Sequence, residues 1–248
     1  MANPFSLEGK TILITGAASG IGRATAKECA NMGATLALMD LNADGLESVK
    51  AELCDERVLT FAVDLTNYEL LCNTVSQLPK LDGVFSNAGI VKSLMAKFSG
   101  KEDMEKIFEV NTFSHINLVQ QLISLKKLSK GASIVFTSSM SGVFAGLAGG
   151  SLYGATKAAL VGYTKALAIE LAPRGIRVNT IHPGMIETPL TKGTALSQDV
   201  LDEDAKNYPL GRYGKPEEVA YAVIYLLSDA TVWMTGSQLL LDGGYSVK

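Results

Sequence analysis

The stretch TILITGAASGIG, residues 11–22, contains the strongest indication of the fold. It begins with a short aliphatic run typical of a buried strand and continues into a glycine-rich turn with Gly16, Gly20 and Gly22. The next segment, GIGRATAKECANMG, has helical periodicity, so the turn lies at a helix N-terminus. Backbone N–H groups and the helix dipole favour a pyrophosphate there. The stretch predicts a dinucleotide-binding unit, with the spacing GxxxGxG in place of the general GxGxxG.

The alternation of short apolar runs and longer helical segments continues along the chain. Seven runs have the composition of buried strands: TILIT, TLALMD, LTFAVD, DGVFSNAG, SIVFTSS, IRVNTIHPG and SQLLLDGG. Strict alternation of strand and helix predicts a doubly wound parallel sheet with helices on both faces. We expect an α/β, Rossmann-type single domain of about seven strands over residues 1–248. The polar, proline-containing insertion at 187–216 is predicted to be a substrate-binding lid.

Composition limits the classes of function. The 248 residues carry a net charge of −3, and no basic stripe indicates a nucleic-acid surface. Three cysteines without a CxxC pair and only two histidines argue against a disulfide framework and a metal site. The most apolar run, VAYAVIYLL, is too short to span a membrane, and MANPFSLEGK has no signal-peptide pattern. We expect a cytoplasmic protein that binds no metal, nucleic acid or membrane.

Acidic residues end the second and third predicted strands. Asp40 follows the glycine turn at the offset of about 20 residues where a carboxylate binds the hydroxyls of an adenosine ribose. A carboxylate there repels a 2′-phosphate, and neither Arg nor Lys follows in LNADG, so the sequence favours NAD over NADP. A solvated aspartate in a turn is the alternative. Asp64, in VDL, is predicted to cap the adenine amino group.

Tyr153 and Lys157 lie four residues apart in SLYGATKAALVGYTKALAIELA, which has the pattern of one helix. This spacing places both side chains on one helix face. An ammonium beside a phenol favours the phenolate, so we expect the pKa of Tyr153 to fall from ~10 towards neutral pH. Such a tyrosine can give or take a proton. On its own the pair is far more often two common surface residues than a catalytic pair.

These features, with NAG (87–89), SSMSG (138–142) and YGATK (153–157), resemble the classical subtype of the short-chain dehydrogenase/reductase family. The resemblance covers essentially the whole chain, and the motifs occur in the family's order. It implies a metal-independent oxidoreductase that interconverts a secondary alcohol and a ketone by hydride transfer with NAD(P). It also implies that Tyr153 is the general acid/base, that Lys157 binds the nicotinamide ribose, and that Asn111 holds a water of a proton relay.

The resemblance further implies a serine that hydrogen-bonds the substrate oxygen. Alignment of the SxxG element on Gly142 selects Ser139, with Ser138 and Ser141 as alternatives. The separation from Ser139 to Tyr153 is about one residue longer than usual in the family, which an extra residue in VFAGLAGGSL explains. The expected catalytic residues are Ser139, Tyr153, Lys157 and Asn111.

The element HPGMIETP resembles the part of the family that binds the nicotinamide carboxamide, here through the backbone of Ile186 and the hydroxyl of Thr188. His182 is interpreted as a strand-end residue. The cofactor-binding residues expected from all motifs are Gly16, Ser19, Gly20, Ile21, Gly22, Asp40, Leu41, Asp64, Leu65, Asn87, Ala88, Gly89, Tyr153, Lys157, Pro183, Gly184, Ile186 and Thr188.

The substrate is less well defined by the sequence. The C-terminal segment resembles 3-oxoacyl-acyl-carrier-protein reductases and also sugar, polyol and hydroxy-acid dehydrogenases. Asp40 argues against the first group, because reduction of acyl thioesters usually uses NADP. A non-catalytic dinucleotide-binding regulator is the alternative from another class. Phe144, Leu147, Met185 and the segment 189–210 are expected to line the substrate pocket.

Self-association is also predicted. The helix that carries Lys157 contains small residues that permit close helix packing, and in the family the corresponding helix packs against a second subunit. We therefore expect a homo-oligomer, a dimer or a homotetramer, that acts on a small-molecule alcohol or ketone. The small residues are Ala158, Ala159, Gly162, Ala166 and Ala168.

Overall fold

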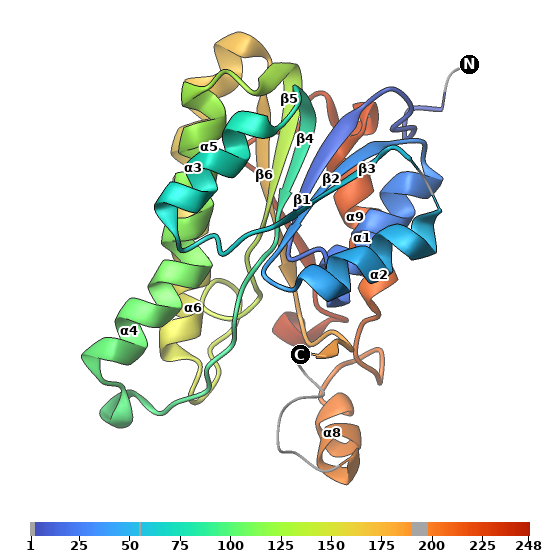
Figure 1. Cartoon of the computed structure of the whole chain (residues 1–248). Coiled ribbons are helices and arrows are strands. Elements are labelled where there is room, and N and C mark those ends of the chain that lie inside the picture. Colours follow the sequence, from blue (N-terminus) through green and yellow to red (C-terminus); the bar gives the residue numbers. More distant parts are fainter. Residues whose placement is uncertain (1–2, 55, 190–197) are drawn as a thin grey trace.

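A parallel sheet of seven strands lies at the centre of the computed structural model, which describes residues 3–54, 56–189 and 198–248 (Figure 1). The strand order is β3-β2-β1-β4-β5-β6-β7. From β1 the chain moves outward to β2 and β3 on one side, and it then returns to the centre to continue with β4 on the other side, so the order reverses between β1 and β4. Doubly wound sheets bind their ligands at this reversal. The predicted Rossmann-type fold is confirmed. The strands are β1 (Thr11–Thr15), β2 (Thr35–Asp40), β3 (Val58–Ala62), β4 (Leu81–Ser86), β5 (Leu128–Thr137), β6 (Arg177–Pro183) and β7 (Gln238–Leu241).

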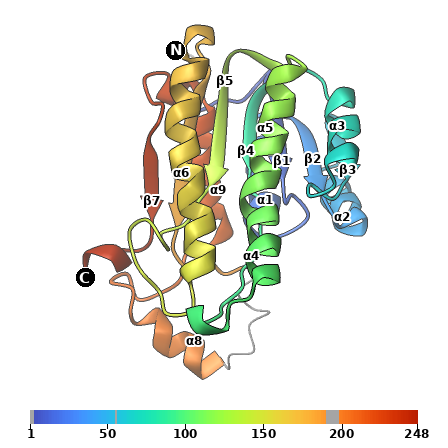
Figure 2. The ribbon, with the colours of Figure 1, turned by 90° about the vertical axis from the view of Figure 1, so that its left-hand side faces the viewer.

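Helices cover both faces of the sheet (Figures 1 and 2). One face carries α1 (Gly20–Asn31), α2 (Ala43–Leu53) and α9 (Pro216–Leu227), and the other carries α3 (Tyr68–Gln77), α5 (Ser114–Ser124) and α6 (Ser151–Leu171). Successive side chains of β1 enter the two separate cores, Leu13 on one face and Ile12 and Ile14 on the other. A strand buried on both faces needs apolar residues throughout, which explains the continuous apolar runs in the sequence.

The helix after β4 contains a π-helical turn. α4 (Lys101–Phe108) continues through the turn at Glu109–Phe113 directly into α5. A π-helical turn holds one residue more than an α-helical turn and occurs frequently at functional sites. Asn111 lies within this turn and is fully buried.

The predicted lid contains one helix within the described residues, α8 (Gln198–Ala205), which extends beyond the carboxyl ends of the strands (Figure 2). Leu201 of α8 packs against a small aromatic cluster that includes Tyr208 and Tyr213. The Tyr213 hydroxyl donates a hydrogen bond to the Asp204 carboxylate at 2.7 Å. Residues 190–197 of the predicted lid lie outside the described residues.

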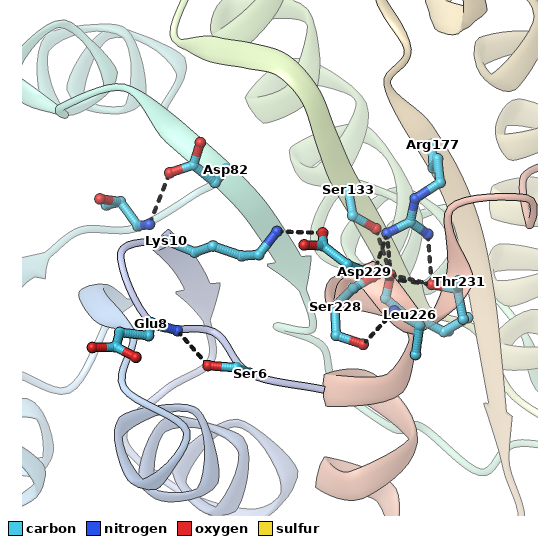
Figure 3. Close-up of polar contacts among 12 residues, drawn as sticks. Ser6, Glu8, Lys10, Asp82, Ser133, Arg177, Leu226, Ser228, Asp229 and Thr231 are labelled. Carbon is cyan, nitrogen blue, oxygen red and sulfur yellow. Dashed lines mark hydrogen bonds and ion pairs between the residues drawn. The ribbon is translucent and has the colours of Figure 1, made fainter. Parts of the chain in front are cut away.

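A buried arginine joins β6 to the C-terminal end of α9 at the amino edge of the sheet (Figure 3). The Arg177 guanidinium donates to the Thr231 hydroxyl at 2.8 Å and to the carbonyls of Leu226 at 2.8 Å and Ser228 at 3.1 Å. These carbonyls end α9, where the helix dipole favours a cation. Nearby, Lys10 forms a 2.7 Å salt bridge with the exposed Asp229.

None of the helices in the described part of the chain has the combination of length and apolar character that a membrane crossing requires.

Candidate active site

A cavity of about 640 Å³ opens at the carboxyl edge of the sheet, at the reversal of the strand order. Fourteen of the residues predicted to bind the cofactor line this cavity, whereas Gly22, Pro183, Gly184 and Ile186 do not. The fourteen are Gly16, Ser19, Gly20, Ile21, Asp40, Leu41, Asp64, Leu65, Asn87, Ala88, Gly89, Tyr153, Lys157 and Thr188.

The glycine turn connects β1 to the first turn of α1 and forms one end of the cavity. Gly16 has a φ of +66°, in the left-handed region that favours glycine. A Cβ at Gly22 would lie 2.0 Å from the Gly16 carbonyl oxygen, so Gly22 allows α1 to pack closely on the turn. Gly16 and Gly22 therefore have different roles: the first shapes the anion-binding turn, and the second places the helix N-terminus behind it.

Asp40 ends β2 beside the glycine turn. One of its carboxylate oxygens accepts a hydrogen bond from the Ala18 amide at 3.0 Å, and the other accepts one from the Asn42 amide at 2.9 Å. These two bonds fix the carboxylate at the wall of the cavity. The geometry fits a group that accepts hydrogen bonds from ribose hydroxyls.

The segment after β4 is held from both sides by residues that the sequence analysis did not identify. The Thr15 hydroxyl accepts hydrogen bonds from the amides of Asn87 at 2.8 Å and Ala88 at 3.1 Å. The buried His115 ring lies 2.8 Å from the Ala88 carbonyl through Nε2 and 2.5 Å from the Ser86 hydroxyl through Nδ1. A carbonyl only accepts, so Nε2 carries the proton and Nδ1 accepts from Ser86. Burial, with the charge of Lys157, lowers the pKa of His115 to about 3, which keeps the ring neutral.

Lys157 and Tyr153 lie on one face of α6 at the inner end of the cavity, as their spacing predicts. The buried Lys157 ammonium donates to the Thr137 carbonyl at 2.9 Å and lies 5.9 Å from the centre of the Tyr153 ring. The Ser139 hydroxyl lies within interaction range of the Tyr153 phenol and acts to lower its pKa. The Ser138 hydroxyl instead donates to the Lys157 carbonyl at 2.8 Å. Of the two adjacent serines, Ser139 is therefore the one that shares the site with the phenol.

The predicted fall in the pKa of Tyr153 is wrong for this arrangement. Burial raises the pKa of the phenol, and the Ser139 hydroxyl opposes that rise. Burial also lowers the pKa of Lys157 to about 8. The sequence prediction considered only the positive charge of Lys157, one helix turn from Tyr153. Burial also removes water from around both groups, and this loss of solvent disfavours the charged form of each.

Asn111 connects three segments of the site. Its side-chain oxygen accepts from the Ile90 amide at 2.8 Å, and its side-chain nitrogen donates to the Ile90 carbonyl at 2.9 Å and to the Thr156 hydroxyl at 3.2 Å. The π-helical turn thus holds the segment after β4 against α6. Val110 and Ser114, on either side of Asn111 along this helix, line the cavity and are further residues that the sequence analysis missed. In the sequence, their spacing from Asn111 along the helix is the one feature that could have identified them as residues of the site.

Of the residues expected to line the substrate pocket, Pro189 lines the large cavity, whereas Phe144, Leu147 and Met185 do not. Phe144 and Leu147 are partly exposed in the loop between β5 and α6, and the Leu94 amide donates to the Gly149 carbonyl of that loop at 2.9 Å. Met185 borders a separate cavity of about 180 Å³, and its amide donates to the Tyr208 hydroxyl at 3.1 Å. The lining of the large cavity includes Asp40 at the end of β2 and Lys157 of α6, which are the residues expected near the two ends of a dinucleotide.

Comparison with known proteins shows what the chain is similar to. Residues 16–246 match the model of a family described as enoyl-(acyl carrier protein) reductase. The chain is 37% identical to the 3-oxoacyl-(acyl-carrier-protein) reductase FabG of Thermotoga maritima over 96% of this chain and 98% of the relative. It is 36% identical to an NAD-dependent glycerol dehydrogenase of Listeria innocua over 98% of this chain and 96% of the relative. A crystal structure of a short-chain type dehydrogenase/reductase from Mycobacterium marinum is 34% identical, with a TM-score of 0.91 and coverage of 99% of this chain and 98% of that one.

Proposed function

The chain belongs to the short-chain dehydrogenase/reductase family, whose members are oxidoreductases that act on CH–OH groups with a nicotinamide dinucleotide, and we propose that it transfers a hydride between NAD and a secondary alcohol or ketone. The observation that carries this proposal is that Tyr153 and Lys157 line the inner end of the cavity together, with the Ser139 hydroxyl within interaction range of the Tyr153 phenol. In this proposal the phenol exchanges the proton and the Ser139 hydroxyl binds the substrate oxygen, while the Lys157 ammonium lies 5.9 Å from the centre of the Tyr153 ring.

The residues of the site have separate roles in the proposed reaction. The dinucleotide, when bound, accepts or supplies the hydride. In oxidation, Tyr153 takes the proton of the substrate hydroxyl at its phenolic oxygen, and in reduction it returns this proton to the oxygen that was the carbonyl. The Ser139 hydroxyl donates a hydrogen bond to the same substrate oxygen, where negative charge develops.

Lys157 and Asn111 support this proton transfer from the inner side. The Thr137 carbonyl fixes the Lys157 ammonium at the cavity wall, from which it binds the nicotinamide ribose. Asn111 fixes the Ile90 backbone beside Lys157 and belongs to the proposed proton relay. Both groups are buried, so their geometry is set before substrate binds.

The proposed preference for NAD is supported by Asp40. Its carboxylate is held at the cavity wall by two backbone amides, and a 2′-phosphate at that place would meet a negative charge. The Listeria innocua relative is named as NAD-dependent. A fluorescence titration with NADH and NADPH tests this step, and tighter binding of NADPH would reject it.

A second candidate activity is reduction of a 3-oxoacyl group on a carrier protein. The name of the Thermotoga maritima relative and the description of the family model favour it. Turnover of a panel of secondary alcohols and of an acetoacetyl thioester, each with the tighter-binding cofactor, separates the two activities. Turnover of the thioester alone would favour the second candidate.

Tyr153→Phe tests the catalytic assignment itself. The substitution removes the exchangeable proton and keeps the ring, so hydride transfer should fall to the background rate while NADH binds with unchanged affinity. Turnover that is insensitive to the loss of the phenol would contradict the role of Tyr153. Cofactor binding without turnover of any substrate by the unmodified chain would instead favour the dinucleotide-binding regulator.

The lid role of residues 187–216, the homo-oligomeric state and the cytoplasmic location stay predictions. Anchoring of α8 by Tyr213 and Asp204 supports a lid that is attached to the substrate side of the site. Exposed apolar side chains on α6 and next to β7, among them Ile169 and Trp233, support self-association.

A further inference from the structure

His182 is a buried residue outside the cavity lining that contacts the backbone of Ser139. It lies near the carboxyl end of β6 and is fully buried. Its Nδ1 lies 2.9 Å from the Ser139 carbonyl oxygen, and its Nε2 lies 2.8 Å from the Thr180 hydroxyl. A carbonyl oxygen only accepts, so Nδ1 carries the proton and Nε2 accepts from Thr180. This assigns one tautomer to the ring.

We propose that His182 is a positioning residue for the reaction, because its imidazole holds the backbone of Ser139 so that the Ser139 hydroxyl meets the Tyr153 phenol. The inference rests on the proposed function, in which that hydroxyl binds the substrate oxygen. It assigns His182 a role beyond that of a strand-end residue.

The backbone around Ser139 shows why a side chain is needed there. The residues on either side pair with β6 through main-chain bonds, Ser138 N–H to the Ile181 carbonyl at 2.9 Å and Met140 N–H to the Pro183 carbonyl at 3.1 Å. The Ser139 carbonyl lies between these bonds and is bound by the imidazole. Among these contacts, the one from His182 can be removed by substitution without breaking a main-chain bond.

The Ser139 side chain depends on this backbone orientation. The Ser141 amide donates to the Ser139 hydroxyl oxygen at 3.1 Å, which fixes the oxygen as an acceptor on one side. The hydroxyl also lies within interaction range of the Tyr153 phenol, whose pKa it acts to lower. A rotation of the Ser139 peptide would disturb both contacts, so the contact at the carbonyl controls the direction of the hydroxyl.

The same imidazole also contacts the loop on the substrate side. The Phe144 ring packs edge-on against the His182 ring, with 5.1 Å between centres and 88° between planes. The Phe144 amide donates to the Met140 carbonyl at 2.9 Å, which closes the turn after Ser139. Burial lowers the pKa of His182, so the ring stays neutral and keeps its single donor directed at Ser139.

Two substitutions separate the donor from the rest of the ring. In His182→Asn the side-chain amide nitrogen takes the place of Nδ1 and can still donate to the Ser139 carbonyl. In His182→Leu the volume is similar and the donor is lost. Val178→Ala is the matched control, since Val178 is a buried residue of the same strand with its side chain in the core and away from Ser139.

We expect His182→Leu to lower kcat by roughly 10- to 100-fold, the range in which a small misplacement of a catalytic group acts, with little change in the Kd for NADH. His182→Asn should recover most of kcat, with a higher KM for substrate because Phe144 loses its ring contact. Val178→Ala should lose stability and keep kcat. A kcat within twofold of the unmodified chain in His182→Leu would overturn the proposal, as would an equal loss in His182→Asn.

A crystal structure of His182→Leu gives a readout that does not depend on turnover. The proposal requires the Ser139 hydroxyl to move away from the Tyr153 phenol, and an unchanged Ser139–Tyr153 contact would reject it. If the unmodified chain turns over no alcohol, the proposed function fails, and this structural comparison still decides whether His182 positions Ser139.

Discussion

The Lys157 ammonium is buried beside the Thr137 carbonyl, and burial lowers its pKa to about 8. In the unfolded chain the same group has a pKa of about 10.4. A lowered lysine pKa means that the folded state is destabilised fully below pH 8 and that this destabilisation disappears as pH rises towards the unfolded value. The residue needed for the proposed chemistry therefore reduces the stability of the fold at neutral pH.

Lys157→Met should raise the free energy of unfolding at pH 7 by about 1–2 kcal/mol, because removal of the buried charge outweighs the lost bond to Thr137. The gain over the unmodified chain should shrink between about pH 8 and pH 10.4. Urea unfolding of both chains at pH 7 and pH 9 measures this difference. A variant that is less stable at pH 7 would show that the charge is better solvated than its surroundings indicate.

Asp40→Asn removes the charge at the ribose end of the cavity and keeps the shape of the side chain. We expect NADH affinity to fall by roughly tenfold, equivalent to about 1.4 kcal/mol. The preference for NADH over NADPH should decrease by at least the same roughly tenfold factor. Isothermal titration with both cofactors measures the ratio. Equal losses for NADH and NADPH would indicate that Asp40 only braces the turn through Ala18 and Asn42.

At the scale of single residues, positions that follow from a local pattern lie at the cavity, and their roles stay predictions. Gly16 and Asp40 follow from their positions after consecutive strands, and both line the cavity. His115 and His182 were not identified as structural partners of the site, because their contacts to Ala88 and Ser139 join segments far apart in the sequence. The direction of the Tyr153 pKa failed for the same reason, since burial is a property of the folded chain.

At the scale of elements, a guanidinium joins β6 to α9, and the Ser133 hydroxyl also donates to the Leu226 carbonyl at 2.7 Å. Arg177 satisfies carbonyls at the end of α9 that have no partner within the helix, and it does so in a buried place. In the nearby pair Lys10–Asp229 the carboxylate is exposed to solvent, in contrast to the buried Arg177 guanidinium (Figure 3). Exposed ion pairs contribute less than about 1 kcal/mol, so the two contacts should differ strongly in importance.

Arg177→Met should destabilise the fold by roughly 3 kcal/mol, because several buried acceptors lose a charged donor. Lys10→Ala, the control at the same edge, should change the free energy of unfolding by less than about 1 kcal/mol. Chemical denaturation measures both. The KM for cofactor should be unchanged in each variant, and a similar small effect for both would show that water replaces the guanidinium.

Elements were predicted well where periodicity extends over many residues. All seven strands and the long helix that carries Tyr153 agree with the alternation of apolar runs. The π-helical turn around Asn111 was not predicted, because its residues have the same apolar pattern as an ordinary helix. The hydrogen bonds of Asn111 to Ile90 and Thr156, which accompany the extra residue, form only in the folded chain.

At the scale of the whole molecule, several large apolar side chains remain exposed, among them one on α6 and one in the segment before β7. Trp233, the single tryptophan, is 100% exposed and Ile169 of α6 is 78% exposed. Gly236, which follows Trp233, lies near Ala168 of α6, so these side chains belong to neighbouring parts of the surface. Exposed apolar surface of this kind is typical of an interface.

Trp233 should therefore report self-association through its own fluorescence. We expect its emission to move to shorter wavelength as protein concentration rises and the ring becomes buried against a second copy. Trp233→Lys should shift the mass measured by light scattering towards the monomer. Emission that stays at the wavelength of a solvated indole at all concentrations would exclude Trp233 from the interface.

The two edges of the sheet also offer separate opportunities for protein engineering. The cofactor cavity lies at the carboxyl edge, whereas Arg177 and its carbonyl partners lie at the amino edge, with the length of the strands between them. Substitutions that raise thermal tolerance can be selected around Arg177 without screening each one for altered substrate preference. Libraries aimed at new substrates can likewise be concentrated at the carboxyl edge, on residues that line the large cavity.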